Sequence, residues 1–78
     1  MANFHPIISP PKYVQVSDYI KGNIESGEYP VGSKLASEEQ YVKMFHVSRG
    51  TVRQAIKDLE FRGMVETQHG KGTFVVRK

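Results

Sequence analysis

Apolar residues recur at every fourth position after the two consecutive prolines at positions 10 and 11. Val16, Ile20 and Ile24 share this spacing, and Tyr13 lies one turn earlier on the same side. The period predicts an amphipathic helix of roughly 12 to 15 residues. Gly27 predicts its end, because glycine readily adopts the left-handed conformation that closes a helix.

A turn and a short second helix are predicted next. Residues 28–32 contain a proline and a glycine, which is typical of a turn. Ser37 followed by Gln40 forms a capping box, in which each side chain bonds the backbone N–H of the other residue. Two glutamates follow in the first turn, where the helix dipole favours acids. The helix is expected to end near Phe45 and His46.

The third helix has the most regular pattern in the chain. Ser48 is its predicted N-cap, and Gly63 lies where it is predicted to stop. Apolar residues between them fall at i, i+3, i+4 and i+7 and form one stripe: Val52, Ala55, Ile56 and Leu59.

The last part of the chain has the pattern of a β-hairpin. Residues 64–68 and 73–76 are rich in β-branched and aromatic side chains, and the glycine-rich segment 69–72 separates them. The order is therefore three helices followed by two strands. This predicts a mainly α fold with a small β-hairpin (α+β), namely a winged helix-turn-helix with a two-stranded wing.

The outward face of the third helix carries the residue types that recognise DNA. At 100° per residue, Gly50, Gln54 and Lys57 point nearly opposite the apolar stripe, and threonine and arginine flank them. Arginine pairs with guanine edges, glutamine with adenine, and threonine with a phosphate or a thymine methyl group. Ser48 and the free N–H groups of the first turn can bind a phosphate. A solvated polar face is the alternative, but the short capped helix and turn before it favour DNA recognition.

The tip of the hairpin is the second candidate site. His69, Gly70 and Lys71 offer an imidazole, an unhindered backbone and a cation. Such a wing can follow the DNA backbone and enter the minor groove. The alternative is an ordinary turn that uses glycine for positive φ.

Charge and composition narrow the function class. With 78 residues the chain forms one domain, and without cysteine it has neither disulfides nor thiolate metal sites, which is consistent with a reducing cytoplasm. No apolar run is long enough for a membrane span, and no secretory signal is present.

Residues 1–42 carry three cations and five carboxylates, whereas residues 43–78 carry eight cations and three carboxylates. The basic half is consistent with a surface that faces phosphates, although chance asymmetry is the alternative.

Catalysis is not indicated. The three histidines lie far apart, and no serine or threonine has a motif that places a base beside it. A chain of this size also has little room for a substrate pocket. We therefore expect a protein that is not an enzyme and that uses neither a cofactor nor a metal.

Several short stretches occur in a distinctive order and spacing: Tyr13–Gln15, Ile24–Gly32, Leu35–Glu38, Val47–Ala55, Leu59–Glu60, Gly63–Val65 and Gly70–Val75. Together they make residues 12–76 resemble the N-terminal DNA-binding domain of GntR-family bacterial transcription regulators. The stretch TVRQA, residues 51–55, is most similar to the HutC-type branch.

The resemblance implies a winged helix that binds a palindromic operator as a homodimer and usually represses transcription. It implies DNA contacts at the start of the second helix, in the third helix and at the wing tip in the minor groove. Together with the residues chosen from the helix face, the predicted DNA-binding set is Ser37, Glu38, Ser48, Arg49, Gly50, Thr51, Arg53, Gln54, His69, Gly70 and Lys71.

Three positions depart from the family pattern. Ala36 replaces the usual proline, so the entry to the second helix is less rigid. Glu39 stands where many members have an arginine near DNA, and no phosphate contact is transferred to it. His46 replaces a glycine at a position that favours positive φ, which costs some strain.

The expected organisation is a flexible arm over residues 1–11 and the DNA-binding domain over residues 12–78. The resemblance implies a further C-terminal domain, absent from this chain, that binds a small effector and supplies most of the dimer contact. We therefore expect a fragment of a longer regulator. Because no apolar surface is obviously left over, we expect the fragment to pair only weakly. A winged helix that binds protein or structured RNA is the alternative function.

Overall fold

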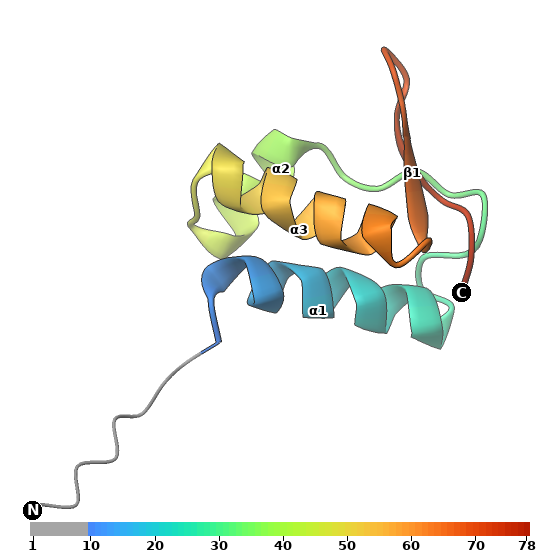
Figure 1. Ribbon diagram of the computed structural model, residues 1–78, viewed down its shortest axis with the longest axis horizontal. Coiled ribbons are helices and arrows are strands. Elements are labelled where there is room, and N and C mark those ends of the chain that lie inside the picture. Colours follow the sequence, from blue (N-terminus) through green and yellow to red (C-terminus); the bar gives the residue numbers. More distant parts are fainter. Residues whose placement is uncertain (1–9) are drawn as a thin grey trace, which may run out of the picture.

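The computed structural model describes residues 10–78, in which three helices are followed by a β-hairpin (Figure 1). The elements are α1 (Lys12–Ser26), α2 (Glu38–Phe45), α3 (Arg49–Phe61), β1 (Val65–Gln68) and β2 (Gly72–Val75). The predicted fold class and the order of the elements are confirmed. The predicted arm falls, apart from its two final prolines, outside the described residues.

Helix α1 lies along α3 and buries the stripe that its sequence period predicts (Figure 1). Val16, Ile20 and Ile24 are all buried, and Gly27 closes the helix with a φ of 89°. Ser17 is also buried, and its hydroxyl donates to Oδ2 of Asp58 on α3 at 2.9 Å. This hydrogen bond satisfies the one buried polar side chain on α1 and helps to fix α3 against it.

Side-chain caps define both helices of the helix-turn-helix. Ser37 and Gln40 form the predicted capping box, with N···O distances of 3.1 and 2.8 Å. His46 ends α2 in the left-handed conformation with a φ of 55°, the positive φ that the family pattern predicts at this position. Ser48 then caps α3 by accepting a hydrogen bond from the N–H of Thr51 at 3.1 Å. These local bonds set where the two helices begin and end.

The hairpin pairs β1 with β2 in antiparallel register. Val65 lies opposite Val75, and Gln68 lies opposite Gly72, so the connecting turn contains only residues 69–71. The predicted turn was one residue too long, because Gly72 belongs to β2. The hairpin projects away from the helices (Figure 1).

The connection between α1 and α2 forms a third edge beside β2, which the sequence did not predict. The N–H of Gly32 donates to the carbonyl oxygen of Val75 at 2.7 Å, and the N–H of Leu35 donates to that of Thr73 at 2.8 Å. Lys34 faces Phe74 in an isolated antiparallel bridge. Residues 32–35 are thereby held against the base of the wing.

The core collects side chains from every element and from the connection. Its buried apolar members are Val16, Ile20, Ile24, Leu35, Tyr41, Val52, Ala55, Leu59, Met64, Val65 and Val75. The expectation that no apolar surface is left over is wrong, because Phe61 is 93% exposed and Val31 is 60% exposed. In the described part of the chain, no helix has the length and apolar character needed to cross a bilayer.

Candidate nucleic-acid interface

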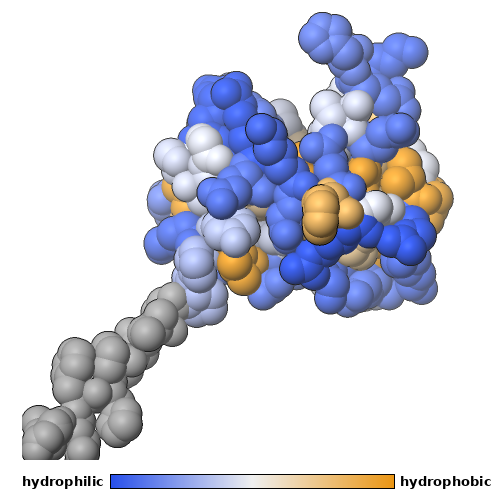
Figure 2. All heavy atoms as spheres, viewed as in Figure 1, coloured by the Kyte–Doolittle hydropathy of each residue, from blue (hydrophilic) through white to orange (hydrophobic). Residues whose placement is uncertain are grey.

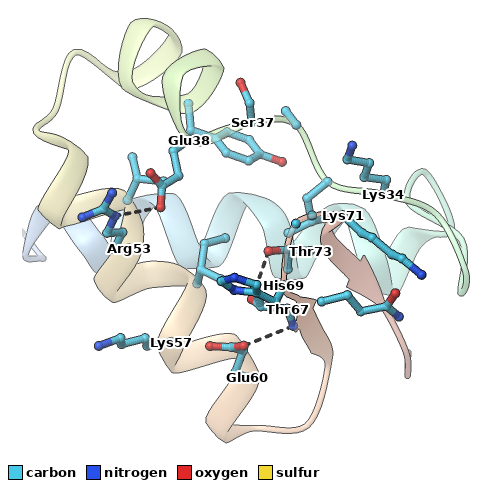
Figure 3. A pocket seen from close by; sticks show the side chains of 18 residues that line it. Lys34, Ser37, Glu38, Arg53, Lys57, Glu60, Thr67, His69, Lys71 and Thr73 are labelled. Atoms are coloured by element: carbon cyan, nitrogen blue, oxygen red, sulfur yellow. Dashed lines mark hydrogen bonds and ion pairs between the residues drawn. The ribbon is translucent and has the colours of Figure 1, made fainter.

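A groove of about 690 Å³ separates α2 and α3 from the wing. Apolar side chains, Leu35, Val52 and Ile56 among them, form part of its lining. Its polar lining includes four cationic side chains, from the α1–α2 connection, α3 and the wing tip: Lys34, Arg53, Lys57 and Lys71 (Figure 3). Figure 2 shows hydrophilic residues covering the projecting hairpin. The groove is therefore open, and several positive charges border it.

The exposed face of α3 carries most of the predicted DNA-binding residues. Arg49, Gly50, Arg53 and Gln54 are exposed, whereas Thr51 is half-buried beside the Ser48 cap. The hydroxyl oxygens of Ser48 and Thr51 lie 2.9 Å apart, so the two side chains share a hydrogen bond. The first two turns of the helix thus present two guanidinium groups and a side-chain amide. These groups can form hydrogen bonds with the edges of DNA bases.

Gly50 has no structural need to be glycine within the described chain. A Cβ atom added there meets no atom closer than Oγ of Ser48, at 3.9 Å. The position is helical and exposed, where glycine is a poor helix former. An unhindered backbone at this point leaves room for an external surface to approach the first turn of α3.

Glu38 is held by the arginines of α3. Its Oε2 atom accepts a hydrogen bond from Nε of Arg53 at 2.9 Å, and Oε1 lies 3.8 Å from Nη1 of Arg49. The hydrogen bond and charge of Glu38 raise the pKa of the Arg53 guanidinium above its ordinary value. The sequence placed Glu38 in the interface but did not predict this cluster. Its carboxylate faces the two arginines of α3.

The wing tip is exposed and opens onto the same groove. His69, Gly70 and Lys71 form the turn between the strands, and Gly70 has a φ of 75°. Hydroxyl groups of Thr67 and Thr73 lie 3.1 Å apart across the strands below the tip. The structure therefore brings the α2 start, Arg53 of α3 and the wing tip together around one groove (Figure 3). The other predicted residues of α3 and its cap lie outside the groove lining: Ser48, Arg49, Gly50, Thr51 and Gln54.

Two further lysines line the groove outside the predicted set. Lys57 is exposed on α3, one turn beyond Arg53 and on the outward face that its helical spacing predicts. Lys34 reaches the groove from the α1–α2 connection. No local sequence pattern predicts that Lys34 lines the groove. Its position depends on backbone pairing with Phe74 of β2, forty residues further along the chain.

These features define a helix-turn-helix domain with a β-hairpin wing. Residues 12–75 match the model of the bacterial regulatory proteins of the gntR family. The chain belongs to this family of transcription regulators, so it belongs to a class of DNA-binding proteins and not to an enzyme family.

Two Bacillus subtilis (strain 168) proteins illustrate the similarity of sequence. An uncharacterized HTH-type transcriptional regulator, YdfD, is 44% identical over 66 residues, which cover 85% of this chain and 14% of YdfD. The HTH-type transcriptional repressor NagR is 40% identical over 65 residues, which cover 83% of this chain and 27% of NagR. The chain therefore spans well under a third of the length of these relatives.

A solved structure extends the comparison to the fold. The crystal structure of AraR(DBD) in complex with operator ORR3 matches with a TM-score of 0.88 and 34% identity, covering 97% of this chain and 92% of that one. A GntR family transcriptional regulator from Listeria monocytogenes matches with a TM-score of 0.82 and 30% identity, covering 90% of this chain and 61% of that one. The winged helix-turn-helix is thus the fold of related regulators.

Proposed function

We propose that this chain is the operator-binding domain of a bacterial transcription regulator that acts as a repressor. The observation that carries the proposal is the arrangement of α3 and the wing tip around one groove. Support comes from the matching AraR(DBD) structure, which is a complex with operator DNA, and from relatives named as repressors, such as NagR.

The proposed complex places the start of α3 in the major groove. Arg49 and Arg53 then contact guanine edges or phosphates, while Thr51 and Gln54 adjust the choice of sequence. The capped N-termini of the two helices, at Ser37 and Ser48, offer free N–H groups to the phosphate backbone.

The wing has a separate proposed role. His69 and Gly70 enter the minor groove, and Lys71 binds the neighbouring backbone. The tip suits this position because all three residues are exposed and a Cβ atom added to Gly70 meets nothing within 4 Å. The wing therefore contributes affinity, and α3 contributes most of the sequence selection.

The wider assembly is part of the same proposal. The regulator binds a palindromic operator in the cytoplasm as a homodimer, and a small effector acts through a C-terminal domain outside this chain. The stretch TVRQA at residues 51–55 favours the HutC-type branch of the family. The exposed apolar side chains, led by Phe61, leave surface for a weak dimer contact within the domain itself.

Selection of bound sequences from a random duplex library tests the proposal. We expect an inverted-repeat consensus whose half-site spacing reports the dimer, with affinity far above that for random duplex and a strong dependence on salt. Salt-sensitive binding without any consensus would contradict the proposal, because it would leave only a basic surface.

One observation keeps a protein partner as a second candidate. Phe61 is 93% exposed and lies at the end of α3, at i+4 from Lys57 and i+11 from Gly50, hence on the same outward face. An exposed aromatic residue is a typical anchor of protein interfaces. Phe61→Ser should leave the binding of one chain to a duplex with a single half-site unchanged if α3 faces DNA through its first turns. Structured RNA is tested by competition, since the deep, narrow major groove of A-form RNA excludes a helix.

A further inference from the structure

Lys34 occupies a position that the fold of the wing determines. Its backbone pairs with Phe74 of β2, and its side chain crosses the backbone of Gly72. A Cβ atom added to Gly72 would lie 2.5 Å from Cε of Lys34 and 3.4 Å from its Nζ. Gly72 also has a φ of 126°, a conformation that disfavours other residues. Because Gly72 has no side chain, the aliphatic part of Lys34 can pass directly over the backbone of the wing.

Three lysines border the groove without an acidic partner. Lys34, Lys57 and Lys71 all line it, and within residues 10–78 none of them forms an ion pair. The two nearby glutamates are already engaged. Glu38 holds the arginines of α3, and Glu60 accepts a hydrogen bond from the N–H of Thr67 at 3.2 Å.

Two lysines on the outer helix surfaces do have acidic partners. Lys21 lies 3.2 Å from Glu25 on α1, and Lys43 lies 3.6 Å from Glu39 on α2. Each has its counter-charge one turn away. The groove lysines come from three separate elements and repel one another, so their common position favours an anionic occupant.

We propose that Lys34 is a phosphate-binding residue, so that the α1–α2 connection forms a third part of the DNA interface beside α3 and the wing. This inference rests on the proposed operator binding and adds a residue to it. The ammonium group acts as a point charge toward one DNA backbone strand that passes between the wing and the start of α2. Lys34 lines the groove together with Ser37 of the α2 cap and Lys71 of the wing tip (Figure 3). The contact is independent of base sequence, because phosphates are the same at every step.

Lys34→Met is the sharpest test, because methionine keeps an apolar stem across Gly72 and removes only the charge. Titrations of the 78-residue chain should use both the selected consensus duplex and a random duplex over a range of salt concentrations. We expect weaker binding to both duplexes by similar factors. The slope of log affinity against log salt should fall by about one, as expected for one lost phosphate contact. Lys34→Arg should retain the affinity.

Lys21→Met is the matched control, since it changes the net charge equally and lies on α1 outside the groove. The inference is overturned if Lys34→Met and Lys21→Met have the same salt slope as the parent chain. It is also overturned if Lys34→Met weakens only the consensus duplex, which would indicate base recognition. A parent chain that does not prefer the consensus would contradict the proposed function instead, and the random-duplex slopes would still test Lys34. Equal thermal unfolding midpoints establish that the variants fold.

Discussion

Oε2 of Glu38 lies 2.9 Å from Nε of Arg53, so the first residue of α2 holds the central arginine of α3. The other carboxylate oxygen lies 3.8 Å from Arg49. Both arginines remain more than half exposed. One carboxylate therefore restrains two cationic side chains on the face proposed to read DNA, while it cancels part of their attraction for phosphates.

Glu38→Ala separates these two effects. Removing the carboxylate should strengthen binding to random duplex, because a negative charge leaves the interface. It should also reduce the ratio of consensus to random affinity, because Arg49 and Arg53 lose the group that orients them. Titration of both duplexes at one salt concentration measures this ratio. Glu39→Ala removes the same charge from a residue paired with Lys43, and it should leave the ratio unchanged. An unchanged ratio in Glu38→Ala would contradict the orienting role.

Arg53→Ala and Lys71→Ala should weaken DNA binding in different ways. The arginine variant should lose roughly tenfold to a hundredfold in affinity for the consensus, with less effect on random duplex, since a bidentate base contact is specific. The lysine variant should weaken both duplexes alike and lower the salt slope by about one. Affinity titrations over a salt series distinguish these patterns. Equal losses on both duplexes for both variants would rule out the division of roles between α3 and the wing.

Local signals in the sequence predicted most of the fold. The four-residue period of α1, the capping box at Ser37 and the Ser48 cap each depend on residues within one or two turns. The sequence did not predict the third edge beside β2, because its hydrogen bonds join residues far apart in the chain, such as Leu35 and Thr73. The extra residue assigned to the turn has the same origin, since glycine is typical of turns and only pairing with Gln68 places Gly72 in β2.

The candidate site was predicted by residue type and helical face but not by its internal contacts. The exposed positions of α3 follow from its period, whereas the pairing of Glu38 with Arg53 joins side chains fifteen residues apart. The DNA-binding domain also does not determine the remainder of a longer regulator. YdfD and NagR match over 66 and 65 residues, yet these make up 14% and 27% of their lengths, so similar DNA-binding domains occur in proteins of different size.

His46→Gly should stabilise the domain. His46 has a φ of 55°, where a side chain costs energy that glycine avoids. We expect the free energy of unfolding to rise by about 0.5–1 kcal/mol, since the extra freedom of glycine in the unfolded chain offsets part of the gain. Urea unfolding measures the change. His46→Ala retains a Cβ atom and should give no such gain, so equal effects of the two variants would show that backbone strain at this position is negligible.

Tyr41 should make the domain sensitive to alkali. Its ring is fully buried, and its hydroxyl lies 3.5 Å from that of Tyr29. Burial and then the hydrogen bond with Tyr29 raise the pKa of the Tyr41 phenol above its ordinary value. In the unfolded chain the pKa is about 10. The folded state therefore holds the proton more tightly, and this contribution to stability is complete below about pH 10 and is lost as the pH rises toward the folded pKa.

Urea unfolding between about pH 9 and pH 11 measures this loss, which approaches about 1.4 kcal/mol per pH unit for one proton. Tyr41→Phe removes the titrating group, so its free energy of unfolding should fall less steeply above about pH 10. Tyr19→Phe is the matched control, because Tyr19 is 42% exposed and packs edge-on against Phe45. The alkaline fall should remain steeper in Tyr19→Phe than in Tyr41→Phe. If both variants lose stability in parallel, a group other than Tyr41 governs alkaline unfolding.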